Sequence, residues 1–146
     1  AMTRLEELLA DLDALGDRSA RIDALIGIAR RYRPVPPEVA VPPYDGAHKV
    51  PACESQAYVW AVPRGDGTLQ LHFAVENPQG ISAMALAVIL DETLSGAPLE
   101  EVAAVDGDVV YRIFGRELSM GKSMGLMGMV NAVRVAATRA ARGGSG

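Results

Sequence analysis

The chain has 146 residues, of which 49% are hydrophobic and 22% charged, as is typical of one soluble globular domain. Its net charge of −4 argues against a nucleic-acid-binding protein, which would normally present a basic surface. The longest apolar runs are too short to cross a bilayer and no secretory leader pattern opens the sequence, so we expect a cytoplasmic protein with no membrane segment.

Residues 1–142 are expected to form a single domain. Ala1-Met2 has the character of an expression scar, and residues 143–146 (GGSG) are expected to be a disordered Gly/Ser tail because they have nothing to bury.

Two helices are predicted at the start of the chain. Thr3 and Glu6 have the spacing of a capping box, and leucines follow at helical spacing as far as Gly16. Asp17 is a suitable N-cap for a second helix, which Pro34 must end. The two predicted buried stripes are Leu5, Leu8, Leu9, Leu12 and Leu15, and Ile22, Leu25, Ile26 and Ala29. The chain is therefore expected to open with a helical hairpin.

A proline-rich loop and a β-hairpin are predicted next. Six prolines from Pro34 to Pro51 exclude a helix or a central strand in that stretch. Residues 56–62 are rich in strand-forming side chains, 64–67 have turn composition, and 69–75 alternate as a return strand.

The remainder of the chain is predicted to be mostly helical. Asn77-Pro78 would cap a helix over residues 81–94, and Pro98 would begin a short one. Residues 109–114 are compatible with either a strand or a helical turn. Ser119 would cap the last long helix, whose expected buried face is Met124, Met127, Val130 and Val133. Helices on both sides of a hairpin indicate an α+β fold.

Two candidate sites fail on spacing. Residues 115–123 (GRELSMGKS) are close to a phosphate-binding loop, but five residues, not four, separate the first glycine from the Gly-Lys pair. His48 and His72 have no further ligand-type side chains at metal-binding spacing. We therefore predict neither a nucleotide site nor a metal site.

Cys53, the only cysteine, is the strongest candidate for a reactive group. A lone cysteine is commonly an inert, buried side chain. Cys53, however, lies where the proline-rich loop meets the first strand, and polar residues Glu54, Ser55 and Gln56 follow it. Because loops on rigid scaffolds commonly carry reactive groups, the sequence favours a nucleophile at this position.

The cysteine segment, Val50–Trp60, resembles the cysteine loop of the SufE family, Val-x-Gly-Cys-x-Ser-x-Val-Trp. Arg31–Pro34 is similar to the segment that closes the family's entry helix, and Gly96–Val102 is similar to its Gly-x-Thr-Pro-Glu-Glu-Ile stretch. Leu118-Ser119 and Lys122–Leu126 resemble its Leu-Ser-x-x-Arg-x-x-Gly-Leu signature. The resemblance covers roughly residues 17–138 in order and spacing.

Three positions depart from the family pattern. Ala52 replaces a glycine before the cysteine, Lys122 replaces an arginine, and Met84 stands where a glycine is usual. The residues expected to shape the loop and recognise a partner are Ala52, Glu54, Ser55, Gln56 and Lys122.

The resemblance implies an α+β fold with an antiparallel sheet of about three strands and helices packed on one face. It implies that Cys53 takes persulfide sulfur from a SufS-like cysteine desulfurase and passes it to an iron–sulfur scaffold complex. The pyridoxal phosphate of that system belongs to the desulfurase, so no cofactor is expected in this chain. We also expect Cys53 to be shielded in the free protein and exposed when the desulfurase docks.

Three other functions fit parts of this pattern. A scaffold that builds clusters needs several thiolate ligands, and a thiol–disulfide oxidoreductase needs a second cysteine, whereas this chain has one cysteine. An adaptor that binds a desulfurase and stimulates it allosterically, with no chemistry at Cys53, stays open, and so does the question of whether the chain is itself an enzyme.

Overall fold

A computed structural model describes residues 2–143 of the chain. The expected tail therefore lies outside the described residues except for Gly143, as does Ala1. The elements are α1 (Arg4–Asp13), α2 (Arg18–Ala29), the 3-10 helix η1 (Gly46–His48), β1 (Ala57–Pro63), β2 (Leu69–Val75), α3 (Ile81–Leu94), α4 (Leu99–Ala103), α5 (Val109–Phe114) and α6 (Met120–Ala141).

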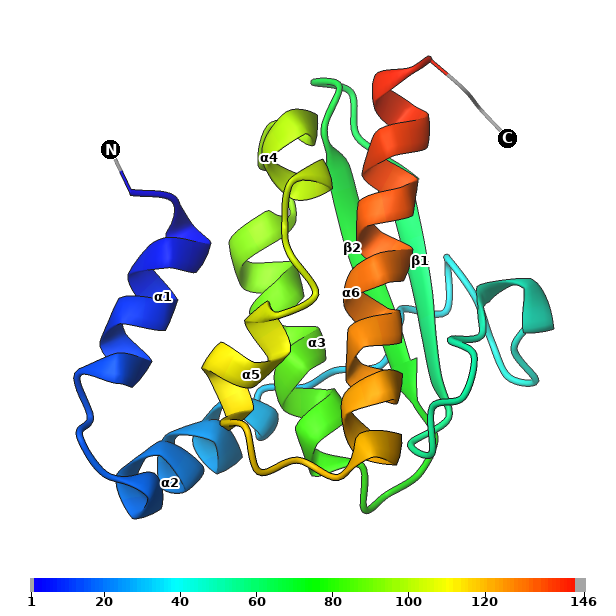
Figure 1. Ribbon diagram of the computed structural model, residues 1–146. Coiled ribbons are helices and arrows are strands. Elements are labelled where there is room, and N and C mark those ends of the chain that lie inside the picture. Colours follow the sequence, from blue (N-terminus) through cyan, green and yellow to red (C-terminus); the bar gives the residue numbers. More distant parts are fainter. Residues whose placement is uncertain (1, 144–146) are drawn as a thin grey trace.

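The fold has a helical layer packed on one face of a small antiparallel sheet (Figure 1). β1 and β2 pair from Ala57↔Val75 to Pro63↔Leu69, and α3 and α6 cover the same face of this pair. The prediction of an α+β fold with helices on one face is thus confirmed. The strand number is corrected, because within residues 2–143 the sheet has two strands, and the only further pairing is the single bridge Lys49↔Tyr58. The 3-10 helix η1 ends directly before Lys49 and Pro51 follows two residues after it, so the pairing does not extend into a third strand.

The main core is centred on α3. This helix is apolar on nearly every side, so it can be covered all round, and α1, α2, β2 and α6 pack on it. The predicted helical hairpin is only partly right, because α1 and α2 follow each other but each packs mainly on α3. Consequently Leu15, Ile22 and Ile26, expected to be buried, are exposed.

A second, aromatic cluster covers the opposite face of the sheet. Tyr58 and Trp60 point there from β1, and Tyr44 from the proline-rich loop lies 5.2 Å from each ring centroid. The His48 ring stacks on Trp60 at 5.1 Å, and its Nδ1 lies 3.0 Å from the Val59 carbonyl oxygen. The loop from residue 34 to 48 therefore acts as the cover that a third layer would otherwise supply.

Three helix predictions are resolved or corrected. Residues 109–114 are helical, as α5. Gly80 is the N-cap of α3, while Asn77 instead caps the preceding turn by accepting from the Gln79 N–H. Ser119 caps α6 as predicted, but Met124 is 55% exposed and Met129 is buried in its place.

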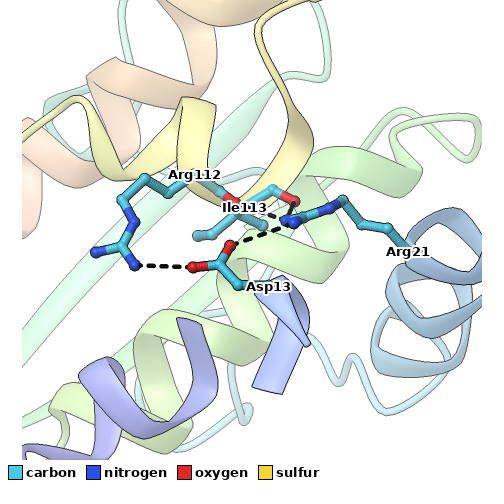
Figure 2. A network of polar contacts seen from close by, with 4 residues as sticks. All are labelled: Asp13, Arg21, Arg112 and Ile113. Carbon is cyan, nitrogen blue, oxygen red and sulfur yellow. Dashed lines mark hydrogen bonds and ion pairs between the residues drawn. The ribbon is translucent and has the colours of Figure 1, made fainter. Parts of the chain in front are cut away.

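A polar network joins α1, α2 and α5 (Figure 2). The guanidinium of Arg21 donates to the carbonyl oxygens of Arg112 and Ile113 at 2.6 and 3.2 Å, which closes the C-terminal end of α5. Asp13 accepts from Arg112 and Arg21, and these hydrogen bonds hold the pKa of its carboxyl below the usual range.

Candidate functional site: the Cys53 loop

Cys53 lies at the tip of a tight loop that leads into β1. The Val50 N–H donates to the Ala57 carbonyl at 2.9 Å and closes the loop at its base. Inside it, the Gln56 N–H donates to the Cys53 carbonyl at 3.0 Å, which forms a turn over residues 53–56. The sulfur is therefore presented by a short segment with a fixed base.

Two residues of this loop have left-handed backbone conformations. Ala52 has φ +56° and Gln56 has φ +53°, in the region that glycine adopts without steric cost. A residue with a Cβ typically loses about 1–2 kcal/mol there. Ala52 thus takes up the conformation for which the family's glycine is suited, and the loop carries strain on both sides of the cysteine.

The far end of the loop is fixed to the segment that follows β2. The Glu76 and Asn77 N–H groups donate to the carbonyls of Gln56 and Ser55, both at 3.1 Å. Gly80 makes room for Ser55, because a Cβ on Gly80 would lie 2.9 Å from the Ser55 side chain. The loop is consequently held at its base and at Ser55–Gln56, with Cys53 between these two anchors.

Three glycines of α6 form the surface on which the loop rests, and we call Gly121, Gly125 and Gly128 the glycine seat. A Cβ on Gly121 would lie 2.9 Å from a Glu54 carboxylate oxygen, and one on Gly128 would lie 2.8 Å from the Val50 side chain. A Cβ on Gly125 would lie 3.0 Å from the Cα of Cys53 and 3.3 Å from its Sγ. A Cβ at Gly125 or Gly128 would therefore require the loop to shift, whereas at Gly121 only the end of the Glu54 side chain would have to move.

The seat follows from helical geometry. Its residues recur at i, i+4 and i+7, a spacing that lines one face of a helix, and in Figure 1 the segment leading into β1 runs beside the first turns of α6. Sequence reasoning missed this role. The signal was present, because glycines inside a helix each lose about 0.8–1 kcal/mol relative to alanine and at this spacing need a packing reason.

Cys53 itself is half-buried and has a free thiol. It lines a shallow hollow together with residues 49–52 and Glu54. Next to this hollow, on the first turns of α6, Met120 and Met124 are 78% and 55% exposed. Large apolar side chains left in solvent beside a thiol are consistent with a surface that a partner covers.

The remaining predicted site residues are partly brought together. Ala52, Glu54, Ser55 and Gln56 all belong to the loop. Lys122 lies on the first turn of α6, where its backbone N–H donates to Ser119 Oγ at 3.2 Å. Its side chain is exposed and, within the described part of the chain, forms no ion pair or hydrogen bond with the loop.

Two structural findings bear on cofactor and membrane binding. Among residues 2–143, no three His, Cys, Asp or Glu side chains lie close enough together to hold a metal ion. None of the described helices is both long and apolar enough to cross a bilayer.

Comparison with known proteins places this loop in a family. The model of the SufE family, described as an Fe-S metabolism associated domain, matches residues 6–137. An uncharacterized SufE-like protein of Rhizobium etli is 30% identical over 138 residues, which cover 91% of this chain and 88% of that protein. The solution structure of a hypothetical protein from Thermus thermophilus has the same fold, with a TM-score of 0.72 at 21% identity over 97% of this chain and 99% of that one. The family resemblance seen in the sequence is therefore confirmed, and the match extends over nearly the whole chain. The chain belongs to the SufE family of Fe–S metabolism associated domains.

Proposed function

We propose that this protein is a sulfur carrier, in which Cys53 accepts persulfide sulfur from a SufS-like cysteine desulfurase and passes it to an iron–sulfur scaffold complex. The observation that carries the proposal is the position of the single thiol at the tip of a loop fixed at both ends. Family membership supports the connection with Fe–S metabolism.

The proposed step is a thiolate exchange that needs no external oxidant or reductant. The Cys53 thiolate attacks the outer sulfur of the donor's Cys–S–S–H group, and a new bond forms between Sγ and that sulfur. The donor's S–S bond breaks, and its electron pair remains on the donor sulfur as a thiolate. The outer sulfur keeps its proton and leaves as the terminal atom of a Cys53 persulfide.

The donor in this proposal is a protein, and the exchange itself needs no cofactor in this chain. The pyridoxal phosphate that removes sulfur from cysteine would reside in the desulfurase. Met120 and Met124 offer a flexible apolar surface beside the loop, of a kind that can adapt to a protein partner.

Movement of the loop is part of the proposed function. In-line attack requires Sγ to face the donor, whereas the cysteine rests against Gly125. The turn that carries Cys53 would lift from Gly125 while the two anchors stay in place. Contacts with the docked desulfurase would offset the loss of packing on α6.

The adaptor alternative is separated from sulfur transfer by a turnover experiment. A desulfurase is assayed for alanine release from cysteine with the wild-type chain, with Cys53→Ser, and without the chain. We expect the wild type to stimulate turnover and Cys53→Ser to bind the desulfurase without stimulating it, because the serine cannot remove the enzyme-bound sulfur. Full stimulation by Cys53→Ser would instead establish the adaptor function.

A further inference from the structure

The two edges of the β1–β2 sheet are treated differently. In an antiparallel pair, every second residue directs its N–H and C=O away from the partner strand. On β2 each of the four such positions has at least one of its two backbone groups bonded within the chain. The covering groups are the Tyr32 hydroxyl, the Val35 amide, the Ser95 hydroxyl and the Gly96 amide, which bond Val75, Phe73, Leu71 and Leu69 at 2.8, 2.8, 3.0 and 2.9 Å.

The edge of β1 is covered only in its first half. The Ala57 carbonyl accepts from the Val50 N–H, and the Val59 carbonyl lies 3.0 Å from His48 Nδ1. By the same alternation the next outward residue is Ala61, and its N–H and C=O have no partner among the described residues. Pro63 follows and has no N–H. Proteins usually protect exposed strand edges, because unpaired backbone groups can pair with another chain. The open position at Ala61 is therefore a candidate site for such pairing.

A groove of about 800 Å³ runs along this open edge. Val59 and Ala61 line it from the sheet, and Ala132, Val135 and Ala136 line it from α6. The segment from residue 47 to 51 forms the opposite side. A free strand edge beside apolar side chains is the arrangement at which a protein binds an extended peptide as an additional strand.

The charges around the groove have one sign. Lys49 lies at one side of it and Arg139 at the other. None of the described residues that line it is acidic, although the chain has 18 acidic residues and a net charge of −4. The groove therefore favours an occupant that combines acidic and apolar side chains.

We propose that this groove binds a short, extended, acidic and apolar segment of the protein that exchanges sulfur with Cys53, and that the segment pairs with the Ala61 backbone. The identity of the partner rests on the proposed function, whereas the site rests on the groove itself. The groove and the cysteine hollow share Lys49, Val50 and Pro51, so a segment in the groove leads toward the sulfur. Val50 already packs on Gly128, and the remaining helical wall, from Asn131 to Ala140, is about 14 Å long, which accommodates about four residues of extended chain.

The test is a titration of the ¹⁵N-labelled full chain with a synthetic peptide, acetyl-Asp-Val-Glu-Val-Glu-Val-Asp-amide, followed by backbone NMR. We expect saturable shifts at Val59, Ala61, Ala132 and Val135. Two matched peptides serve as controls, one with lysine in place of each acid and one with N-methylated valines. Both should bind at least about fivefold more weakly, because the first loses charge complementarity and the second cannot complete the ladder.

Two protein variants sharpen the test. Arg139→Glu should weaken binding of the acidic peptide by about fivefold. Arg30→Glu, at the C-cap of α2 and not in the groove, changes the net charge equally and should leave binding unchanged. Cys53→Ser should bind the peptide like the wild type, so the result is independent of sulfur transfer.

Several outcomes would overturn the proposal. These are no shifts at the groove at millimolar peptide, equal binding of the lysine peptide, and shifts that map elsewhere. Concentration-dependent dimerisation that shifts the same residues without peptide would assign the groove to a second copy of the chain and would overturn the proposal as well.

Discussion

Substitution of Gly125 by alanine tests whether the cysteine loop depends on the glycine seat. The added methyl carbon would lie 3.0 Å from the Cys53 Cα, 3.3 Å from its Sγ and 3.4 Å from its Cβ. Carbon atoms pack best at about 3.5–4.0 Å, so the loop must move away from α6 by roughly 0.5–1 Å. Cys53 can make this movement because its only backbone bond in the loop is to Gln56, inside the same turn.

Two opposing contributions determine the stability of the Gly125→Ala variant. Alanine is favoured over glycine inside a helix by about 0.8–1 kcal/mol, whereas displacement of the loop loses packing of similar size. We therefore expect a free energy of unfolding within about 1 kcal/mol of the wild type. If the lost packing is about 1 kcal/mol, the population with a lifted loop rises about fivefold, and alkylation of Cys53 should accelerate by the same factor.

The matched control is Gly27→Ala in α2. Nothing lies within 4 Å of a Cβ at Gly27, so this variant gains helix propensity without touching the loop. It should be more stable than the wild type by about 0.8–1 kcal/mol and should be alkylated at the wild-type rate. Alkylation is followed by mass spectrometry and stability by urea unfolding. If Gly125→Ala behaves like Gly27→Ala in both measurements, the loop does not rest on the helix as described.

Four further predictions address the loop, the polar network and metal binding. Ala52→Gly should raise the free energy of unfolding by about 0.5–1 kcal/mol, since glycine adopts φ +56° without steric cost; a loss of stability would contradict the strain assigned there. Arg21→Ala should lower that free energy by about 1–2 kcal/mol in urea unfolding, with Arg21→Lys in between, because two carbonyls at the end of α5 lose their donor; unchanged unfolding would show that the network contributes nothing. Asp13→Asn should lower the melting temperature at pH 7. The pKa of the Asp13 carboxyl is depressed by Arg112 and Arg21, so its contribution is present at neutral pH, and the difference from the wild type should vanish as the pH falls well below about 4; a constant difference would refute this origin. Anaerobic reconstitution with iron and sulfide should give no stoichiometric cluster absorbance per monomer, because one thiolate and two separated histidines do not make a cluster site.

The elements formed by local signals were predictable. Thr3, Asp17 and Ser119 cap their helices as expected, because each cap depends on a residue only three positions away. The β-hairpin was predictable for the same reason, since its turn and alternation are local.

The errors came from tertiary packing. Periodicity identifies the apolar residues of a helix but not which of them its neighbours cover. Ile22 and Ile26 were therefore expected to be buried, whereas the other side of α2 packs on α3. Met124 was assigned to the buried face of α6, but Leu126, Met129, Val130 and Val133 form that face, and Met124 points away from it into solvent. The expected third strand is a single bridge in the structure. Whether a segment pairs with a distant strand depends on tertiary contacts, which a local sequence pattern does not describe.

The sequence was sufficient to predict which residue is the candidate reactive group, but not how the loop around it packs. Uniqueness and polar neighbours single out Cys53 in the sequence. The close approach to Gly125 and the two anchors depend on α6 and on the segment after β2, which lie far along the chain.

The most direct test of the central claim is the mass of the protein after incubation with a cysteine desulfurase and cysteine. The account predicts that the intact chain gains the mass of one sulfur atom, that a reductant removes it, and that peptide mapping places it on Cys53. Cys53→Ser should gain nothing under the same conditions. An unmodified wild-type chain, in the presence of a desulfurase that binds it and turns over cysteine, would contradict the claim that Cys53 accepts sulfur.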